Sequence, residues 1–194
     1  MDPAETRQRL LAQRRALNSA QVAATSTLVA ARISCLPAYR QAAVVGTYHS
    51  IRGEIDLSAL ENQTGPQLAF PLTTPGEPLR FMIPSGPLAD GPFGTKEPAT
   101  GQEVDPLDLD LVLMPLVAAD LQGNRIGHGA GFYDRTFANR QAGKPPFLWG
   151  VAHSFQVVDT FTPQPWDVPL DLIITDTGLA GPGMNHLESP IGKD

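Results

Sequence analysis

The residues whose types and spacing could do chemistry are concentrated in one stretch, residues 120–135, which reads DLQGNRIGHGAGFYDR. Three glycines alternate with other residues in it: Gly127, Gly129 and Gly131. Because glycine has no side chain, backbone N–H groups in such a loop can approach a phosphate closely. A helix that begins directly after the glycines would point the positive end of its dipole at the same place. The spacing therefore predicts a phosphate-binding loop.

Charged residues flank this loop. Arg125 and Arg135 supply cationic groups, and Asp134 supplies a hard oxygen ligand of the kind that binds magnesium. Two better-known phosphate loops do not fit the stretch. A Walker loop requires Gly-Lys-Ser/Thr, which is absent, and a dinucleotide fingerprint starting at Gly127 would require glycine where Phe132 stands. Alternating glycines also occur in ordinary surface loops, so the functional reading depends on the accompanying charges.

The elements that must position this loop alternate between strands and helices. An apolar strand over residues 109–114 leads into the loop. Other strands are expected at residues 43–48, 68–71, 79–84, 147–152 and 172–175, and helices at 3–17, 19–36 and 132–141. This alternation predicts one α/β domain of 194 residues with a largely parallel sheet. A proline- and glycine-rich loop is expected over residues 85–108, and a mobile tail after about residue 178.

Two acidic residues outside the loop are candidates for the same site. Glu54 follows the strand at 43–48, and residues just past the carboxyl end of a parallel strand line the ligand crevice. Glu54 would equally suit the first turn of a short helix, where the dipole favours an acidic side chain. Asp167 also lies on a loop near a strand end, so Asp134 and Asp167 could share one cation.

Composition restricts the kind of protein. The net charge of −6 argues against nonspecific nucleic acid binding, and no apolar run is long enough to span a bilayer. The single cysteine, Cys35, cannot form an internal disulfide, so we expect a cytoplasmic protein and a buried, inert thiol. Most N-terminal arginines are expected on a solvated helix face, and His153 on the surface. Trp149 and Trp166 are expected to fill packing positions.

Several blocks in order make the chain resemble the 5-formyltetrahydrofolate cyclo-ligase family, over about residues 7–175. The specific part is Gly-x-Gly-x-Gly-Phe-Tyr-Asp-Arg preceded by Asp-x-x-Gly-x-Arg. The other matching blocks are Arg7 with residues 14–17, then residues 48–56, 93–98, 153–156, 166–169 and 174–175. The resemblance implies a three-layer α/β fold like that of sugar-phosphate isomerases and CoA transferases.

The resemblance also implies a reaction. Members of the family use ATP and Mg²⁺ to phosphorylate the formyl oxygen of 5-formyltetrahydrofolate. N10 of the folate then attacks that carbon, phosphate leaves, and 5,10-methenyltetrahydrofolate forms. Such chemistry needs positioning and charge neutralisation but no nucleophile from the protein. We expect a monomer whose partner is this small-molecule substrate.

Site residues follow from the resemblance position by position. The ATP contacts implied are Arg7, Arg125, Ile126, Gly127, His128, Gly129, Ala130, Gly131, Phe132 and Tyr133. The folate contacts implied are His49, Glu54, His128, Gly129, Ala130, Gly131 and Phe132. Asp134 and Asp167 match the magnesium ligands. Glu54, Arg125 and Tyr133 are the implied catalytic residues, and Glu54 is placed to orient N10 or receive its proton.

The chain also departs from the family pattern. Pro3 stands where many members have a lysine for ATP, His49 replaces a commonly apolar residue, and His128 and Ala130 replace residues that are basic in some members. Fewer cations around the triphosphate would weaken ATP binding. A non-catalytic protein that binds folate or adenine nucleotide is therefore an alternative, as is an enzyme for another N-formyl or phosphorylated metabolite.

Overall fold

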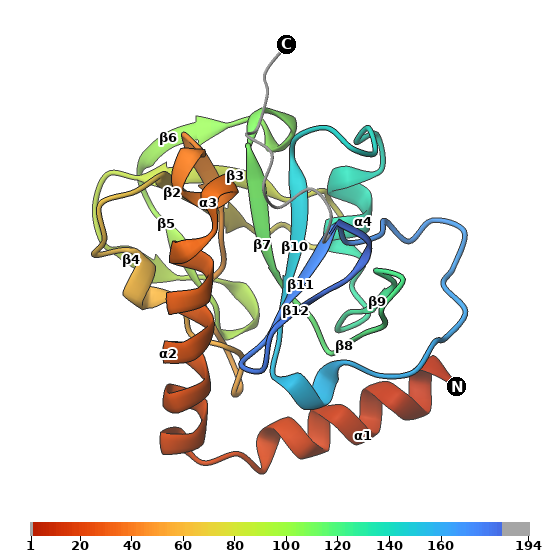
Figure 1. The fold of residues 1–194 in the computed structure, drawn as a ribbon. Coiled ribbons are helices and arrows are strands. Elements are labelled where there is room, and N and C mark those ends of the chain that lie inside the picture. Colours follow the sequence, from red (N-terminus) through yellow and green to blue (C-terminus); the bar gives the residue numbers. More distant parts are fainter. Residues whose placement is uncertain (1, 184–194) are drawn as a thin grey trace.

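The computed structural model describes residues 2–183, which build a large central sheet with helices on both faces (Figure 1). The eight strands run in the order β12-β11-β10-β7-β1-β2-β3-β6. Their bounds are β1 Val44–Gly46, β2 Gln67–Leu72, β3 Arg80–Pro84, β6 Gly101–Val104, β7 Leu111–Pro115, β10 Phe147–Val151, β11 Leu172–Ile174 and β12 Leu179–Ala180. The five strands from β2 to β11 pair in parallel, and the strands beyond them pair antiparallel. The expected α/β fold is confirmed.

The central strand β7 shows why the sheet needs cover on both faces. Leu111 and Leu113 point into one buried apolar cluster, and Val112 and Met114 point into another. This alternation is the two-residue period of a strand, here apolar on both faces because each face meets other elements. The first cluster includes Val29 of helix α2 (Ser19–Cys35), and the second includes Phe137 of helix α4 (Phe132–Phe137).

Helix α1 (Pro3–Arg15) packs away from the main sheet, against the hairpin of β8 (Ala118–Ala119) and β9 (Arg125–Ile126). The contact is apolar, because Leu10 of α1 joins the hairpin's Ala118 and Ile126 in a third buried cluster. Asp2 caps α1, since its Oδ1 accepts a hydrogen bond of 2.9 Å from the N–H of Ala4. The N-terminal segment is thereby fixed beside the glycine loop that follows β9.

Several element boundaries differ from the expectation. Asn18, rather than Ser19, caps α2 through a reciprocal pair of hydrogen bonds with Gln21. Pro37 does not only end α2 but begins a further short helix, α3 (Pro37–Gln41), because proline suits the first helical position. Helix α4 ends at Phe137, four residues earlier than expected.

Two segments expected to be irregular contain strands. Residues 85–108 form β4 (Leu88–Asp90), β5 (Lys96–Pro98) and β6, with 3-10 turns η2 (Pro92–Gly94) and η3 (Pro106–Asp108). Of the tail expected after residue 178, β12 pairs antiparallel with β11, and residues 184–194 lie outside the described part of the chain. Short strands of three or four residues give too little periodicity to be found from sequence.

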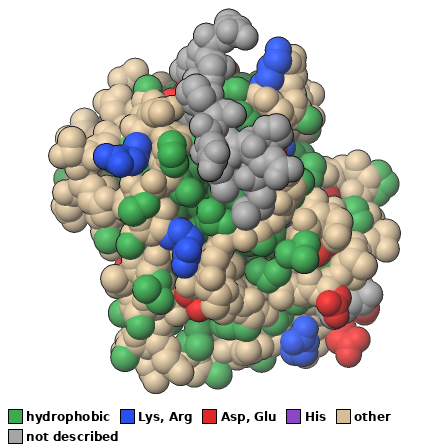
Figure 2. Space-filling view, viewed as in Figure 1, with side chains coloured by type: hydrophobic (Ala, Val, Ile, Leu, Met, Phe, Trp, Pro, Cys, Tyr) green, Lys and Arg blue, Asp and Glu red, His purple; other side chains and the backbone are tan. Residues whose placement is uncertain are grey.

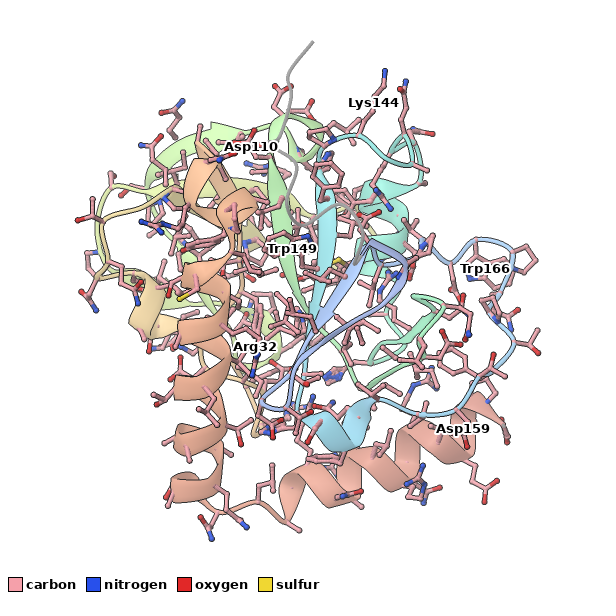
Figure 3. The ribbon with its side chains drawn as sticks, in the orientation of Figure 1. Arg32, Asp110, Lys144, Trp149, Asp159 and Trp166 are labelled. Carbon is pink, nitrogen blue, oxygen red and sulfur yellow. The ribbon has the colours of Figure 1, made fainter. Side chains whose placement is uncertain are left out.

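The burial of some side chains differs from the expectation. Cys35 is exposed, because the last turn of α2 turns that position away from the sheet. Trp149 is buried on β10, whereas Trp166 lies on an outer loop with 67% of its surface exposed (Figure 3). His153 is buried, and its ring Nε2 lies 2.9 Å from the carbonyl of Gly53.

No helix within residues 2–183 has the length and apolar character to cross a bilayer. In the space-filling view, Lys and Arg side chains lie singly on the visible face, and one at its lower right lies beside acidic side chains (Figure 2).

Candidate active site

A pocket of about 590 Å³ opens beyond the carboxyl ends of β1 and β7. Its walls come from α1, the loop after β1, the glycine loop, the β4–β5 region and the loop before β11. Every residue implied by the family resemblance lines it: Arg7, His49, Glu54, Arg125, Ile126, Gly127, His128, Gly129, Ala130, Gly131, Phe132, Tyr133, Asp134 and Asp167. The fold therefore brings together side chains from segments that are far apart in sequence.

The glycine loop is held open toward the pocket. A hairpin, β8–β9, separates it from β7, so the strand does not run directly into the loop as expected. Gly129 and Gly131 adopt left-handed backbone angles, with φ of 99° and 65°. A Cβ built at Gly127 or Gly129 would have no heavy atom within 4 Å. The space beside these backbone groups is therefore free for a ligand.

Two contacts fix the ends of this loop. Arg7 donates a hydrogen bond of 2.9 Å from Nε to the carbonyl of Gly127, which ties α1 to the loop. Before the loop, Asp120 is fully buried, and its Oδ1 accepts hydrogen bonds from the N–H groups of Gln122 and Asn124. Asp120 is thus a structural residue of the turn between β8 and β9.

An ion pair occupies one corner of the pocket. Arg125 Nη2 lies 2.5 Å from Asp134 Oδ1, and the N–H of Val168 donates to the same oxygen at 3.1 Å. Arg125 Nη1 donates to the carbonyl of Val168. These contacts join α4 to the loop that carries Asp167. Both Nη groups of Arg125 therefore already donate to protein acceptors. A phosphate bound here would have to share Arg125 with them.

The two candidate magnesium ligands lie in this part of the pocket. Asp167 Oδ2 accepts a hydrogen bond of 2.8 Å from the N–H of Gln164, and Asp134 is 21% exposed. Within residues 2–183, no group of three or more His, Cys, Asp or Glu side chains converges as a metal site. Mg²⁺ is commonly held by one or two carboxylates together with substrate phosphates and water, so two pocket carboxylates suit it.

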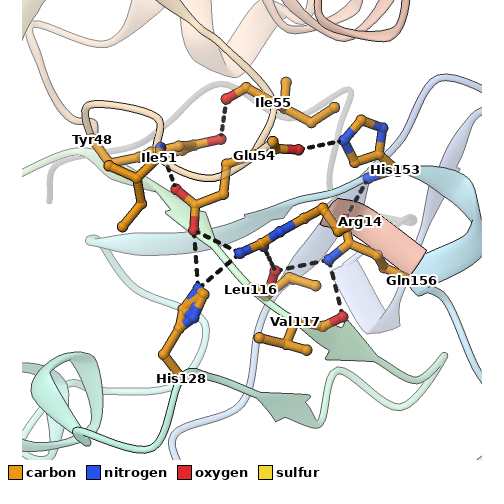
Figure 4. A network of polar contacts seen from close by, with 11 residues as sticks. Arg14, Tyr48, Ile51, Glu54, Ile55, Leu116, Val117, His128, His153 and Gln156 are labelled. Atoms are coloured by element: carbon orange, nitrogen blue, oxygen red, sulfur yellow. Dashed lines mark hydrogen bonds and ion pairs between the residues drawn. The ribbon is translucent and has the colours of Figure 1, made fainter. Parts of the chain in front are cut away.

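A second polar network forms the floor of the pocket (Figure 4). Glu54 Oε1 lies 3.1 Å from His128 Nε2 and 3.5 Å from Arg14 Nη2, and its Oε2 accepts a hydrogen bond from the N–H of Ile51 at 3.0 Å. Arg14 Nη1 also donates to the carbonyl of Leu116 at 3.1 Å. The network joins α1, the loop after β1, the end of β7 and the glycine loop.

Burial governs the acid–base properties of this network. Desolvation raises the pKa of Glu54, and the nearby Arg14 opposes that rise. Desolvation lowers the pKa of His128, and the charges of Arg14, Arg52 and Arg7 lower it further. Burial also raises the pKa of the Tyr133 phenol, with a smaller contribution from Glu54. Both Tyr133 and His128 are therefore uncharged at neutral pH.

Arg14 is the main residue that sequence reasoning misplaced. It was given no role of its own, and most N-terminal arginines were expected on a solvated helix face, yet Arg14 is 1% exposed and makes an ion pair with Glu54. Helical spacing carried a signal, because Leu10 lies four residues earlier on the same face of α1 and is also buried. Arg15, the next residue, is exposed.

Two aromatic side chains at the mouth of the pocket, Phe93 and Trp166, were not among the predicted site residues, whereas Phe132 was. The rings of Phe93 and Phe132 lie 6.1 Å apart, and the guanidinium of Arg135 lies over the ring of Phe132 at 5.2 Å. Phe93 is 56% exposed and has a left-handed φ of 62°. Together with the exposed Trp166, these rings offer flat apolar surfaces to a planar ligand.

Comparison with known proteins assigns the family. Residues 2–176 match the family model described as the 5-formyltetrahydrofolate cyclo-ligase family. The chain is 33% identical over 172 residues to the 5-formyltetrahydrofolate cyclo-ligase of Escherichia coli, covering 84% of this chain and 94% of that one. It is 39% identical over 145 residues to the Haemophilus influenzae protein of the same name, covering 70% and 77%.

A solved structure agrees with this assignment. The structure of Aquifex aeolicus 5,10-methenyltetrahydrofolate synthetase superposes with a TM-score of 0.81 at 32% identity, and 93% of each chain is covered. The structure of the Mycoplasma pneumoniae protein of that name, at 24% identity and a TM-score of 0.73, supports the fold. The fold, the arrangement of the pocket and these similarities together show that the chain belongs to the 5-formyltetrahydrofolate cyclo-ligase family.

Proposed function

We propose that this chain is an ATP- and Mg²⁺-dependent enzyme that converts 5-formyltetrahydrofolate to 5,10-methenyltetrahydrofolate, with release of ADP and phosphate. The observation that carries the proposal is the meeting of two different sets of groups in one pocket. An open glycine loop with Arg7 lies on one side, and the Glu54–His128 pair lies beside it. Such a pocket can hold a phosphate donor and a substrate that must lose a proton.

The first step is phosphoryl transfer. The formyl oxygen attacks the γ-phosphorus, the bond to the β–γ bridging oxygen breaks, and ADP leaves. Backbone N–H groups of the loop from Gly127 to Gly131 bind the phosphate oxygens, and Arg7 holds the loop in place. Asp134 and Asp167 would hold Mg²⁺, which supplies charge neutralisation at the β- and γ-phosphates when bound. Tyr133, half-buried with its ring stacked on that of Phe137, presents an uncharged phenol to the same region.

The second step closes the ring. N10 attacks the activated formyl carbon and loses its proton, and the carbon–oxygen bond breaks as phosphate leaves. A folate is planar at its pterin end, and the pocket offers the rings of Phe93 and Phe132 as well as His49. Orientation of N10 against the carbon is the main requirement, since the attack is intramolecular. Glu54 lies at the floor of the pocket, where it can act on this step.

The direct experiment is to mix purified protein with 5-formyltetrahydrofolate, ATP and Mg²⁺ and to follow the methenyl chromophore. One ADP and one phosphate should form for each methenyl product. Absence of product from folded protein would overturn the proposal.

A non-catalytic binding protein is the alternative, favoured by one feature of the pocket. Pro3 lines it where many family members have a lysine, and Ala130 lines it where some members have a basic residue. A binding protein would show saturable binding of folate or ATP without release of ADP. An enzyme for another metabolite would release ADP only with that metabolite, and 5-formyltetrahydrofolate would not compete.

A further inference from the structure

One histidine of the pocket is paired with a carboxylate that is almost entirely buried. The side chain of His128 is 37% exposed in the pocket, and that of Glu54 is 5% exposed. Their contact joins His128 Nε2 and Glu54 Oε1 at 3.1 Å, and in Figure 4 the imidazole lies directly beneath the carboxylate. An imidazole held by a buried carboxylate is the arrangement that makes histidine a general base in hydrolases.

Two contacts of His128 Nε2 bear on the tautomer of the ring. Nε2 lies 3.1 Å from Arg14 Nη2 as well as 3.1 Å from Glu54 Oε1. If Nε2 carried no proton, it would accept from Arg14 Nη2, but its lone pair would also face the carboxylate oxygen of Glu54. If Nε2 carries the proton, it donates to Oε1, and the guanidinium of Arg14 approaches the same oxygen at 3.5 Å. The second arrangement gives the Glu54 carboxylate a donor from the imidazole and keeps its ion pair with Arg14, and it leaves Nδ1 as the basic nitrogen.

Glu54 is poorly placed to take a proton from substrate itself. Its Oε1 accepts from His128 and faces Arg14, and its Oε2 accepts from the N–H of Ile51. Each oxygen therefore already has a protein partner, and only 5% of the side chain is exposed. We propose that His128 Nδ1 is the general base that removes the N10 proton, and that Glu54 is a positioning residue that fixes the imidazole.

This assignment deepens the proposed function and rests on it. As N10 bonds to the formyl carbon, its proton passes to Nδ1, and the resulting imidazolium donates both N–H groups, one of them to Glu54. The proton then leaves to solvent, which reaches His128 because the ring is partly exposed. Phosphate departs from the carbon with the electron pair of the broken bond. Protons and charge balance without any further reactant.

The charges around His128 set the expected pH dependence. Arg7 and Arg14 of α1 and Arg52 of the loop after β1 are the basic groups around it, and Glu54 is the acidic group in contact. Burial first and then these arginines lower the pKa of His128 below its ordinary value of 6.5. A base must be uncharged to accept a proton. The rate of ring closure should therefore be constant above pH 6.5 and fall as the pH drops through the lowered pKa.

The tautomer can be measured without turnover. In protein labelled with ¹⁵N-histidine, the two ring nitrogens of His128 give distinct shifts for Nε2–H and Nδ1–H forms. We expect the Nε2–H form above pH 7, and replacement of Glu54 by Gln should increase the fraction of the other form. A dominant Nδ1–H form in the unsubstituted protein would overturn the assignment.

The kinetic test uses His128→Gln with His153→Gln as a matched control. Glutamine at 128 can still donate to Glu54 but cannot act as a base, so ring closure should slow by about 10² to 10⁴-fold. The fall in rate at low pH, which is the acid limb of the pH profile, should vanish. His153 is also buried near this network, through its contact with Gly53, but it does not line the pocket. The control should keep the acid limb.

Glu54→Gln gives a second kinetic readout. Loss of the anion makes the imidazolium less stable, so the acid limb should move to lower pH. An unchanged limb would contradict a positioning role for Glu54. If His128→Gln keeps the limb and stays within about threefold of the unsubstituted rate, His128 is not the base, although the proposed function stands. Absence of methenyl product from the unsubstituted protein would overturn the function and this role together.

Discussion

Two corners of the same pocket each hold an arginine paired with a carboxylate, and they are built in opposite ways. Arg125 and Asp134 are nine residues apart and belong to one motif. Arg14 and Glu54 come from α1 and from the loop after β1, and their partner His128 lies 114 residues from Arg14. The first corner is local in sequence, and the second exists only because the chain folds.

The two corners also differ in burial. The side chains of Arg14 and Glu54 are 1% and 5% exposed, whereas Asp134 is 21% exposed beside Arg125 at 5%. Forming an ion pair that is almost excluded from water costs free energy, because both charges lose hydration. Removing one partner costs more, because the other is left as an unpaired buried charge. We therefore expect the Arg14 corner to govern stability and the Asp134 corner to govern catalysis.

Removal of Arg14 gives the largest expected effect on folding. Arg14→Met should lower the free energy of unfolding by about 3 to 5 kcal/mol, because Glu54 would lose its cation while staying buried. Urea denaturation measures this loss. The neighbouring exposed Arg15→Met is the control and should change stability by less than about 0.5 kcal/mol. Equal effects of the two substitutions would contradict the difference between the faces of α1.

The second prediction concerns the other corner. Asp134→Asn should lower turnover by at least about 100-fold, because a neutral amide is a poor magnesium ligand and no longer pairs with Arg125. Folate affinity, measured by fluorescence titration, should change by less than about threefold. Asp159→Asn, at an exposed position on the outer loop in Figure 3, is the control and should leave both values unchanged. Parallel loss of turnover and folate binding would mean that Asp134 does not serve the metal.

The third prediction compares two glycines. Gly127→Ala should leave the free energy of unfolding within about 0.5 kcal/mol, because its Cβ would enter open space, but ATP should bind about tenfold more weakly. Gly123→Ala is the contrast, since its Cβ would lie 2.4 Å from the carbonyl of Leu170 at a φ of 87°. That variant should lose stability. Unchanged ATP affinity in Gly127→Ala, measured by calorimetry, would show that the open space is not the nucleotide site.

The smallest expected effect is on the pH dependence of stability. Burial lowers the pKa of His153, so below pH 6.5 the unfolded chain takes up a proton that the folded chain resists. Stability from this group is complete above pH 6.5 and decreases as the pH falls. In thermal melts, the melting temperature of His153→Gln should fall less between about pH 7.5 and 5.5 than that of the unsubstituted protein. A pH dependence identical to that of the unsubstituted protein would contradict this contribution of His153.

Much of the sheet could be predicted, because its central strands carry uninterrupted apolar runs. Residues 109–114 and 147–152 were found almost within their true limits as β7 and β10. Segments whose burial depends on distant partners were not found. The exposure of Cys35, the burial of His153 and the strands between residues 85 and 108 depend on where other elements lie. A local sequence pattern does not specify which distant residues become neighbours in the fold.

The sequence by itself determined that residues 120–135 contain a glycine loop with Arg125 and Asp134 beside it. These properties depend on residue type and short spacing, since only glycine leaves the backbone bare at a left-handed turn. The tertiary structure alone decided that Arg14 turns inward to meet Glu54 and His128 beneath that loop. Such a pairing is stable only where other elements exclude water, and that exclusion is a property of the packed chain.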